Sequence, residues 1–263
     1  MRLKECWMRP LDFLIVGVQK SGTTALAEFL DEHPKIEMSK PKEVHVFDRE
    51  DIVKSNAEDP SSVIQDLYRD CFQDDVSLCR GEATPVYCYF PESLLRLSEY
   101  NPGLKLVLLL RDPVERAYSH YRMEFNRDNE RLSYWRALLS ESARLKSDQD
   151  KFSEGSHHRR HSYRNRGYYS KQLRMIHRHF PSENVLVLGS HDMRHKHQET
   201  LDRIFSFLGL PSVPIPQREV FSSGSRVEEA PISSFLLRMA FRRDMKLLQE
   251  MIEFDISDWR RFF

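Results

Sequence analysis

The segment FLIVGVQKSGTTALAEFL, residues 13–30, decides the fold class because a turn joins its apolar run directly to a helix-forming pattern. Residues 13–18 predict a buried strand, and residues 22–32 repeat apolar side chains at helical spacing. Gly17 and Gly22 stand five residues apart, as in the GxxxxGK[ST] loop of nucleotide triphosphatases. The turn therefore predicts a binding site for a phosphate or a similar oxyanion at the start of the helix.

The lysine of this turn does not stand where the triphosphatase loop places it. Thr23 occupies the usual lysine position, and the only lysine of the loop, Lys20, comes two residues before Gly22. Backbone N–H groups and the positive end of a helix still favour an anion here, and the hydroxyl groups of Thr23 and Thr24 add donors. The simpler alternative is a turn that only connects a strand to a helix.

Further apolar runs extend the alternation of strands and helices along the chain. Continuous runs predict buried strands at 36–38, 105–110 and 185–188. Helical periodicity predicts helices near 61–70, 113–126, 131–146, 168–179, 198–208 and 231–252. The sequence therefore predicts an α/β fold with a central parallel sheet flanked by helices and a P-loop-like strand-turn-helix unit, in a single domain spanning residues 1–263.

Charge and composition limit the classes of partner. Lys plus Arg and Asp plus Glu are equal at 40 each, which gives no global reason to expect nucleic acid or an anionic membrane. No apolar run approaches the roughly 20 residues of a membrane span, so none is expected. The 4 cysteines lack zinc-type spacing and no Asn-x-Ser/Thr acceptor occurs, which favours a reducing, cytoplasmic location. The composition predicts a soluble globular protein.

A second polar cluster, RDPVERAYS, follows the apolar run at 105–110. Asp112 can cap a helix whose first residue is Pro113, which places Arg111 at the carboxyl end of the preceding strand. Open α/β sheets bind ligands at that edge, where a guanidinium can hold a phosphate with two hydrogen bonds. Ser119, eight residues after Arg111, could donate to the same anion. The alternative is that Arg111 pairs with a nearby carboxylate on the surface.

Together, the two clusters resemble the cofactor signatures of sulfotransferases that use 3′-phosphoadenosine 5′-phosphosulfate. The resemblance implies that the first loop holds the 5′-phosphosulfate and that Arg111 with Ser119 holds the 3′-phosphate. It also accounts for the displaced lysine, since Lys20 would stabilise the charge that grows on the leaving oxygen as the S–O bond breaks. No metal is expected. The donor-binding residues implied for the first loop are Lys20, Ser21, Gly22, Thr23 and Thr24.

Within this family, EVHVFD at 43–48 is similar to the Glu-Val-His-Phe-Phe-Asp stretch of heparan sulfate glucosaminyl 3-O-sulfotransferases. By this resemblance Glu43 is the catalytic base, and His45 orients it or the acceptor. In an extended strand, side chains two residues apart share a face, which would bring Glu43 and His45 together. Asp48 is expected only to support the loop. The alternatives are a surface glutamate and a hydrogen-bonded, non-catalytic histidine.

Two departures from the glycan enzymes leave the acceptor open. Those enzymes carry a Glu-Lys-Thr-Pro stretch, whereas this chain has Ala83 in place of the lysine. They also have a cysteine pair around a Lys-Gly-Arg cofactor loop, whereas the corresponding FSSGSRVEEAP stretch here has no cysteine. Gly224, Ser225 and Arg226 are the candidates for the remaining cofactor contact, and a solvated arginine is the alternative. Sugar, polyketide and alkaloid hydroxyls and lipid head groups are all compatible acceptors.

The segment 147–167 is locally basic and has no apolar period, which predicts a long mobile loop. Such a loop could close over the cofactor or attract an acidic acceptor. A solvated excursion is the alternative. A metal site in its HHRRH stretch is disfavoured because that stretch lacks a carboxylate partner.

The sequence therefore predicts a sulfotransferase that moves a sulfuryl group from 3′-phosphoadenosine 5′-phosphosulfate to a hydroxyl of a sugar or small natural product. Transfer would be in line, with Glu43 as base and 3′-phosphoadenosine 5′-phosphate as the second product. The expected partner is a small-molecule or glycan acceptor, with neither nucleic acid nor a membrane span. An atypical P-loop nucleotide kinase or triphosphatase, binding ATP with Mg²⁺, is one alternative. A non-catalytic nucleotide-binding protein is the other, against which the joint presence of Lys20, Glu43 and Arg111 argues.

Overall fold

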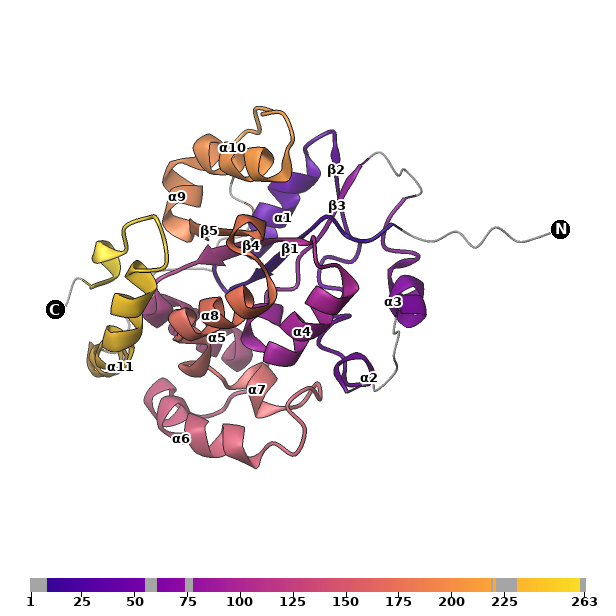
Figure 1. The fold of residues 1–263 in the computed structure, drawn as a ribbon. Coiled ribbons are helices and arrows are strands. Elements are labelled where there is room, and N and C mark those ends of the chain that lie inside the picture. Colours follow the sequence, from indigo (N-terminus) through magenta and orange to yellow (C-terminus); the bar gives the residue numbers. More distant parts are fainter. Residues whose placement is uncertain (1–8, 55–60, 74–77, 219, 221–230, 261–263) are drawn as a thin grey trace.

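A computed structural model describes the chain except for residues 1–8, 55–60, 74–77, 219, 221–230 and 261–263. Its described residues form one parallel sheet with the strand order β2-β3-β1-β4-β5 (Figure 1). The strands are β1 (Phe13–Gly17), β2 (Ile36–Met38), β3 (Cys79–Glu82), β4 (Lys105–Leu110) and β5 (Val185–Gly189). The predicted α/β fold with a central parallel sheet is therefore confirmed.

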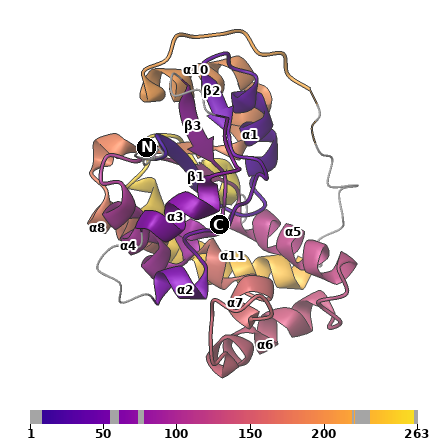
Figure 2. The same cartoon turned by 90° about the vertical axis from the view of Figure 1, so that its right-hand side faces the viewer.

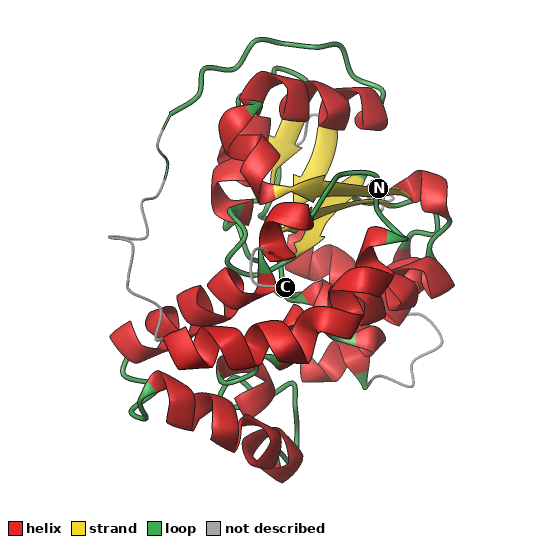
Figure 3. Cartoon of the chain, turned by 90° about the vertical axis from the view of Figure 1, so that its left-hand side faces the viewer, coloured by secondary structure: helices red, strands yellow, loops and turns green. Residues whose placement is uncertain are grey.

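Helices cover both faces of this sheet (Figure 3). The first face is covered by α1 (Thr23–Asp31), α9 (Ser190–His195) and α10 (His197–Leu208). The second face is covered by α4 (Pro91–Tyr100), α5 (Pro113–Asn126), α8 (Tyr169–His179) and α11 (Pro231–Gln249). The remaining helices are α2 (Glu50–Val53), α3 (Ser61–Tyr68), α6 (Tyr134–Ser147) and α7 (His157–Arg160). Short 3₁₀ turns are η1 (Tyr87–Tyr89), η2 (Asn165–Gly167), η3 (Ser182–Asn184) and η4 (Ser257–Arg260). None of the described helices has the length and hydropathy needed to span a bilayer.

The central position of β1 follows from its apolar sequence. All of its residues are buried. Phe13 and Ile15 pack into the core under α1, whereas Leu14 and Val16 pack into the larger core on the opposite face. Successive side chains of a strand point to opposite faces, so a strand that is apolar at every position requires cover on both sides.

The carboxyl end of β4 leads directly into α5. The Asp112 carboxylate accepts hydrogen bonds from the N–H groups of Val114 at 2.8 Å and Glu115 at 3.3 Å, and Pro113 takes the first helical position. The helix begins where these two local signals predict. Because β1 and β4 are neighbours in the sheet, Arg111 lies beside the turn that follows β1.

The short strand β3 was not predicted from the sequence, because CRGE contains no apolar run. It nevertheless pairs with both β1 and β2. A Cβ atom at Gly81 would lie 2.2 Å from the Phe13 ring, so glycine is the residue that lets this ring pack onto β3. The register of the neighbouring strand, and not a local pattern, places these residues in the sheet.

The segment 147–167 differs from the expected long loop. It contains α7 and η2, and residues such as Ser162 and Arg166 are buried. The Ser156 hydroxyl caps α7 by accepting from the N–H of Arg159. Polar side chains hold this segment together, which is why apolar periodicity did not reveal it. Figure 2 shows α6 and α7 gathered with α2 on the side of the sheet opposite to α1 and α10.

Candidate functional site

The turn after β1 has the geometry of an anion-binding loop. Gly22 caps α1 with a φ of 101°, a left-handed conformation that glycine adopts without strain. Because glycine has no side chain that could cap the helix, the N–H groups in the first turn of α1 are left to bind an anion. Thr23 is buried and Thr24 is half-buried in this turn of helix. Ser21 faces inward instead, since its hydroxyl donates to the Val18 carbonyl at 2.6 Å.

Lys20 supplies the charge of this loop. Its φ is 74° and its side chain is half-buried. Within the part of the chain that the structure describes, its ammonium group has no hydrogen-bond or ion-pair partner. Burial lowers the pKa of Lys20, and the charges of Arg127 and Arg111 lower it further against smaller opposing effects of Glu124 and Glu43. Because the two arginines have a larger effect than the two carboxylates, this part of the loop is electrostatically suited to an anionic ligand.

Arg111 joins the second cluster to this loop. One guanidinium nitrogen, Nη1, donates to the main-chain carbonyl of Lys20 at 3.2 Å. The other side of the guanidinium pairs with Glu115, with Nη2 and Oε2 3.0 Å apart. The surface pair considered from the sequence therefore forms, and Arg111 also contacts the loop. Ser119 lies half-buried on α5, and its hydroxyl has no hydrogen bond to any described residue.

The EVHVFD stretch turns at its histidine, so the expected extended geometry is wrong. His45 has a φ of 58° and lies outside the strands of the sheet. Its ring nevertheless lies between two carboxylates. Nε2 is 3.4 Å from Oε2 of Glu43, and Nδ1 is 2.9 Å from Oδ2 of Asp48. The turn, and not strand alternation, brings Glu43 and His45 together.

These contacts change the ionisation of both groups. Burial opposes the charge of Glu43, but the hydrogen bond from His45 and the nearby Lys42 ammonium outweigh it and lower the pKa of Glu43 to about 2. Lys42 Nζ lies 2.7 Å from Oε1 of Glu43. Burial also opposes the charge of His45, whereas its hydrogen bonds to Asp48 and Glu43 raise the pKa of His45 to about 9. At neutral pH the site therefore holds a carboxylate beside an imidazolium.

Asp48 has a larger part in this cluster than the sequence indicated. It is fully buried, and Arg159 of α7 donates to Oδ2 of its carboxylate at 2.6 Å. Arg159 is separated from Asp48 by 111 residues. The only sequence signal for Arg159 was the basic character of the segment 147–167, which does not single out one arginine.

A second buried carboxyl lies behind the His45 loop. Glu82, at the end of β3, accepts a hydrogen bond from the Tyr68 hydroxyl at 2.8 Å and another from the Thr84 hydroxyl. The Thr84 oxygen in turn accepts from the N–H of His45 at 3.4 Å. Burial raises the pKa of Glu82 to about 7, although the hydrogen bonds from Thr84 and Tyr68 act in the opposite direction.

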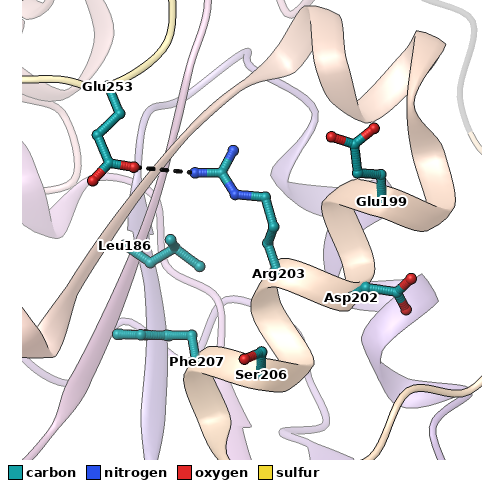
Figure 4. A pocket seen from close by; sticks show the side chains of 7 residues that line it. All are labelled: Leu186, Glu199, Asp202, Arg203, Ser206, Phe207 and Glu253. Atoms are coloured by element: carbon teal, nitrogen blue, oxygen red, sulfur yellow. Dashed lines mark ion pairs between the residues drawn. The ribbon is translucent and has the colours of Figure 1, made fainter.

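Gly224, Ser225 and Arg226, the predicted third cofactor contact, lie outside the described residues. A separate open pocket lies beside α10, where Arg203 and Glu253 face each other at 3.8 Å (Figure 4). None of the candidate site residues that the structure describes lines it. No group of three or more His, Cys, Asp or Glu side chains in the described ranges is placed to hold a metal ion.

The comparison with solved structures agrees with this architecture. A sulfotransferase from Alicyclobacillus acidocaldarius superposes with a TM-score of 0.78 at 25% identity, covering 96% of this chain and 100% of its own. The sulfotransferase domain of the curacin biosynthetic pathway superposes with a TM-score of 0.52 at 16% identity over 78% of this chain and 76% of its own, which shows a shared fold.

Curated relatives point the same way. Human heparan sulfate glucosamine 3-O-sulfotransferase 3B1 is 28% identical over 200 residues, which is 76% of this chain and 46% of that protein. The membrane-associated sulfotransferase kil1 of Dictyostelium discoideum is 37% identical over 114 residues, which is 42% of this chain and 22% of that protein. The aligned part of the chain thus spans less than half the length of these relatives. The sulfotransferase domain family matches residues 10–223, and the chain therefore belongs to the sulfotransferase family, whose reaction is sulfuryl transfer.

Proposed function

We propose that this sulfotransferase uses 3′-phosphoadenosine 5′-phosphosulfate as donor and a hydroxyl group of a small molecule or glycan as acceptor. The observation that carries this proposal is Lys20, whose ammonium group pairs with no residue that the structure describes and which lies beside Arg111 at a turn whose helix start is open to an anion. This set of cations and N–H donors fits an anionic nucleotide that needs no metal ion. The glycan part of the acceptor class is supported by the similarity to heparan sulfate glucosamine 3-O-sulfotransferase 3B1.

In the proposed reaction the donor supplies an activated sulfuryl group. An acceptor oxygen forms a bond to sulfur while the bond between sulfur and the 5′-phosphate oxygen breaks, and 3′-phosphoadenosine 5′-phosphate leaves. Glu43 takes the acceptor proton, His45 orients the Glu43 carboxylate, and Lys20 stabilises the charge that grows on the leaving oxygen. Arg111 and Ser119 bind the 3′-phosphate, and the loop residues Ser21 to Thr24 bind the 5′ end through their backbone.

The donor assignment is tested by the thermal stability of the pure protein with 3′-phosphoadenosine 5′-phosphate, with ADP and with ATP plus Mg²⁺. A ligand at 100 times its dissociation constant adds about 2.7 kcal/mol to the free energy of unfolding. We expect a shift with the 3′-phosphorylated nucleotide and a much smaller one with the other two. A shift only with ATP and Mg²⁺ would overturn the assignment and return the loop to the triphosphatase class.

The contact with the 3′-phosphate is tested by a pair of variants. Arg111→Ala removes a charged hydrogen-bond donor, which is worth about 1.5–3 kcal/mol of nucleotide binding. In the free protein Arg111 is paired with Glu115, and this pair must break before Arg111 can bind the nucleotide. An ion pair near the surface is worth only about 0–1 kcal/mol, so this cost is small. Glu115→Gln is therefore the matched control, and it should leave the affinity unchanged or increase it. If Arg111→Ala bound 3′-phosphoadenosine 5′-phosphate as tightly as the unmodified protein does, the proposed role of Arg111 would be contradicted.

A further inference from the structure

Asp48 forms the buried end of the contact chain that runs through His45 to Glu43. Its carboxylate faces His45 Nδ1 at 2.9 Å and accepts from Arg159 Nη1 at 2.6 Å. Arg159 Nη2 donates to the main-chain oxygen of the same aspartate at 2.6 Å. A single guanidinium thus fixes both the side chain and the backbone of Asp48. A planar, two-pronged group of this kind restricts orientation more than one hydrogen bond does.

Arg159 is itself held firmly in place. Its Nε donates to the Phe152 carbonyl at 2.8 Å. The fully buried Arg166 donates to the carbonyls of His158 and Arg159 at 2.9 and 3.0 Å, and its Nη1 donates to Gln19 at 2.6 Å. Gln19 is the neighbour of Lys20 in the turn after β1. The segment that contains α7 therefore connects the loop of Lys20 with the loop of Glu43.

We propose that Arg159 is a positioning residue for the sulfotransferase reaction, which holds Asp48 so that His45 and through it Glu43 are correctly oriented. The inference rests on the proposed function of Glu43 and extends it to a residue that touches no reacting group. It assigns a role to the basic segment other than closing over the cofactor or attracting an acidic acceptor. Arg159 acts only through Asp48.

The pKa of His45 distinguishes a positioning role of Arg159 from a direct effect of its charge, because the two change this pKa in opposite directions. Among the described residues, the charged groups in contact with the His45 ring are Glu43 and Asp48, which pair in turn with Lys42 and Arg159. The buried Glu82 is linked to the His45 N–H through the Thr84 hydroxyl. The positive charge of Arg159 by itself disfavours a protonated ring. Removing this charge while Asp48 stays in place would therefore raise the pKa of His45. If Asp48 instead loses its orientation, His45 loses a hydrogen-bonded carboxylate, and its pKa falls from about 9 towards the ordinary 6.5.

The experiment is an NMR titration of the full chain labelled with ¹³C at histidine Cε1, with the His45 signal assigned from a His45→Gln spectrum. In Arg159→Ala we expect the His45 midpoint to fall by roughly one pH unit or more. An unchanged or higher midpoint would overturn the proposal. In Asp48→Asn, further removal of Arg159 should not lower the His45 midpoint any more, because Arg159 acts on His45 through Asp48, and the loss of its charge alone would raise the midpoint. An additional fall in the double variant would show that Arg159 acts by another route and would also overturn it.

Arg160 offers a matched control on the same helix. Its guanidinium donates to the Glu154 carbonyl and to Asn129, both at 3.1 Å, and not to Asp48. Arg160→Ala removes an equal charge next in sequence and should leave the His45 midpoint unchanged. An equal fall in both variants would contradict the proposal. If Arg159→Ala does not fold, Arg159→Lys keeps the charge but loses the two-pronged contact, and a smaller fall is expected.

The titration separates this inference from the donor assignment. Arg159 does not contact Lys20 or Arg111, so the thermal shift with 3′-phosphoadenosine 5′-phosphate should be the same in Arg159→Ala as in the unmodified protein. If Arg159→Ala showed a normal thermal shift with the nucleotide and an unchanged His45 midpoint, only the positioning role of Arg159 would be rejected. If neither the unmodified protein nor Arg159→Ala showed a thermal shift with the nucleotide, the donor assignment would be rejected. A lowered His45 midpoint in Arg159→Ala would in that case still support the positioning of His45 by Arg159.

Discussion

Glu82 should make the stability of this protein depend on pH in a predictable direction. Its carboxyl group is fully buried, and burial raises its pKa to about 7 from an ordinary 4.5, against the hydrogen bonds from Thr84 and Tyr68. Between these two pH values the folded protein keeps a proton that the unfolded chain has lost. The free energy of unfolding therefore falls as pH rises through this window. The difference of 7 − 4.5 = 2.5 pH units corresponds to about 3 kcal/mol.

The substitution Glu82→Gln isolates this contribution, because glutamine has a similar shape and does not titrate. Glutamine changes the hydrogen bonds with Tyr68 and Thr84, so the variant has a constant offset in stability whose sign is not the test. The test is how the offset changes with pH. Relative to the unmodified protein, the free energy of unfolding of Glu82→Gln should rise by about 3 kcal/mol in total as the pH increases through this window, most of it between pH 5 and pH 8.

Urea denaturation of both proteins at pH 5 and at pH 8 measures the change. Glu28→Gln, at an exposed position of α1, controls for the loss of a carboxylate in general. An offset of Glu82→Gln that is the same at both pH values would refute the description of Glu82 as a buried acid with a raised pKa. A variant that becomes relatively less stable at pH 8 would show that the two hydroxyl groups stabilise an ionised Glu82.

Two further substitutions test the proposed base and the packing of the sheet. With an acceptor found in a screen of hydroxyl compounds, Glu43→Gln should lower kcat by about 10²- to 10⁴-fold because a general base is lost, while the thermal shift with 3′-phosphoadenosine 5′-phosphate remains. Full turnover would show that Glu43 is not the base. Gly81→Ala should lower the free energy of unfolding in urea by about 1–3 kcal/mol or more, because the new Cβ would lie 2.2 Å from the Phe13 ring. Unchanged stability would mean that this ring moves aside without cost.

The parts of the fold that could be predicted are those specified by neighbouring residues. The apolar run of β1, the capping Asp112 and Pro113 at the start of α5 are local signals, and each leads to the predicted element. β3 has no such signal because its four residues become a strand only through pairing with β1 and β2. The same distinction explains the segment 147–167, which is ordered by polar contacts with distant residues.

The candidate site divides in the same way. Lys20 and Arg111 were expected at one edge of the sheet because parallel strands end there, and the guanidinium of Arg111 does reach the Lys20 carbonyl. Glu43 and His45 were expected to meet, and they do, but through a left-handed turn at His45 that a strand pattern does not encode. The partnership of Asp48 with Arg159 could not be predicted, since no periodic pattern links residues 111 positions apart.

The ionisation of the site constrains how the proposed reaction would proceed. With a pKa of about 2, the Glu43 carboxylate is ionised at neutral pH and can accept a proton, but it is a weak base towards an alcohol. Proton transfer to Glu43 becomes favourable only after the acceptor oxygen has begun to bond to sulfur, which makes its proton more acidic. The larger contribution would then come from the leaving group, where Lys20 has a lowered pKa and is a correspondingly stronger hydrogen-bond donor. In the proposed reaction, the positive charge of Lys20 thus lies on the side of departure, and it favours the movement of negative charge from the acceptor to the nucleotide.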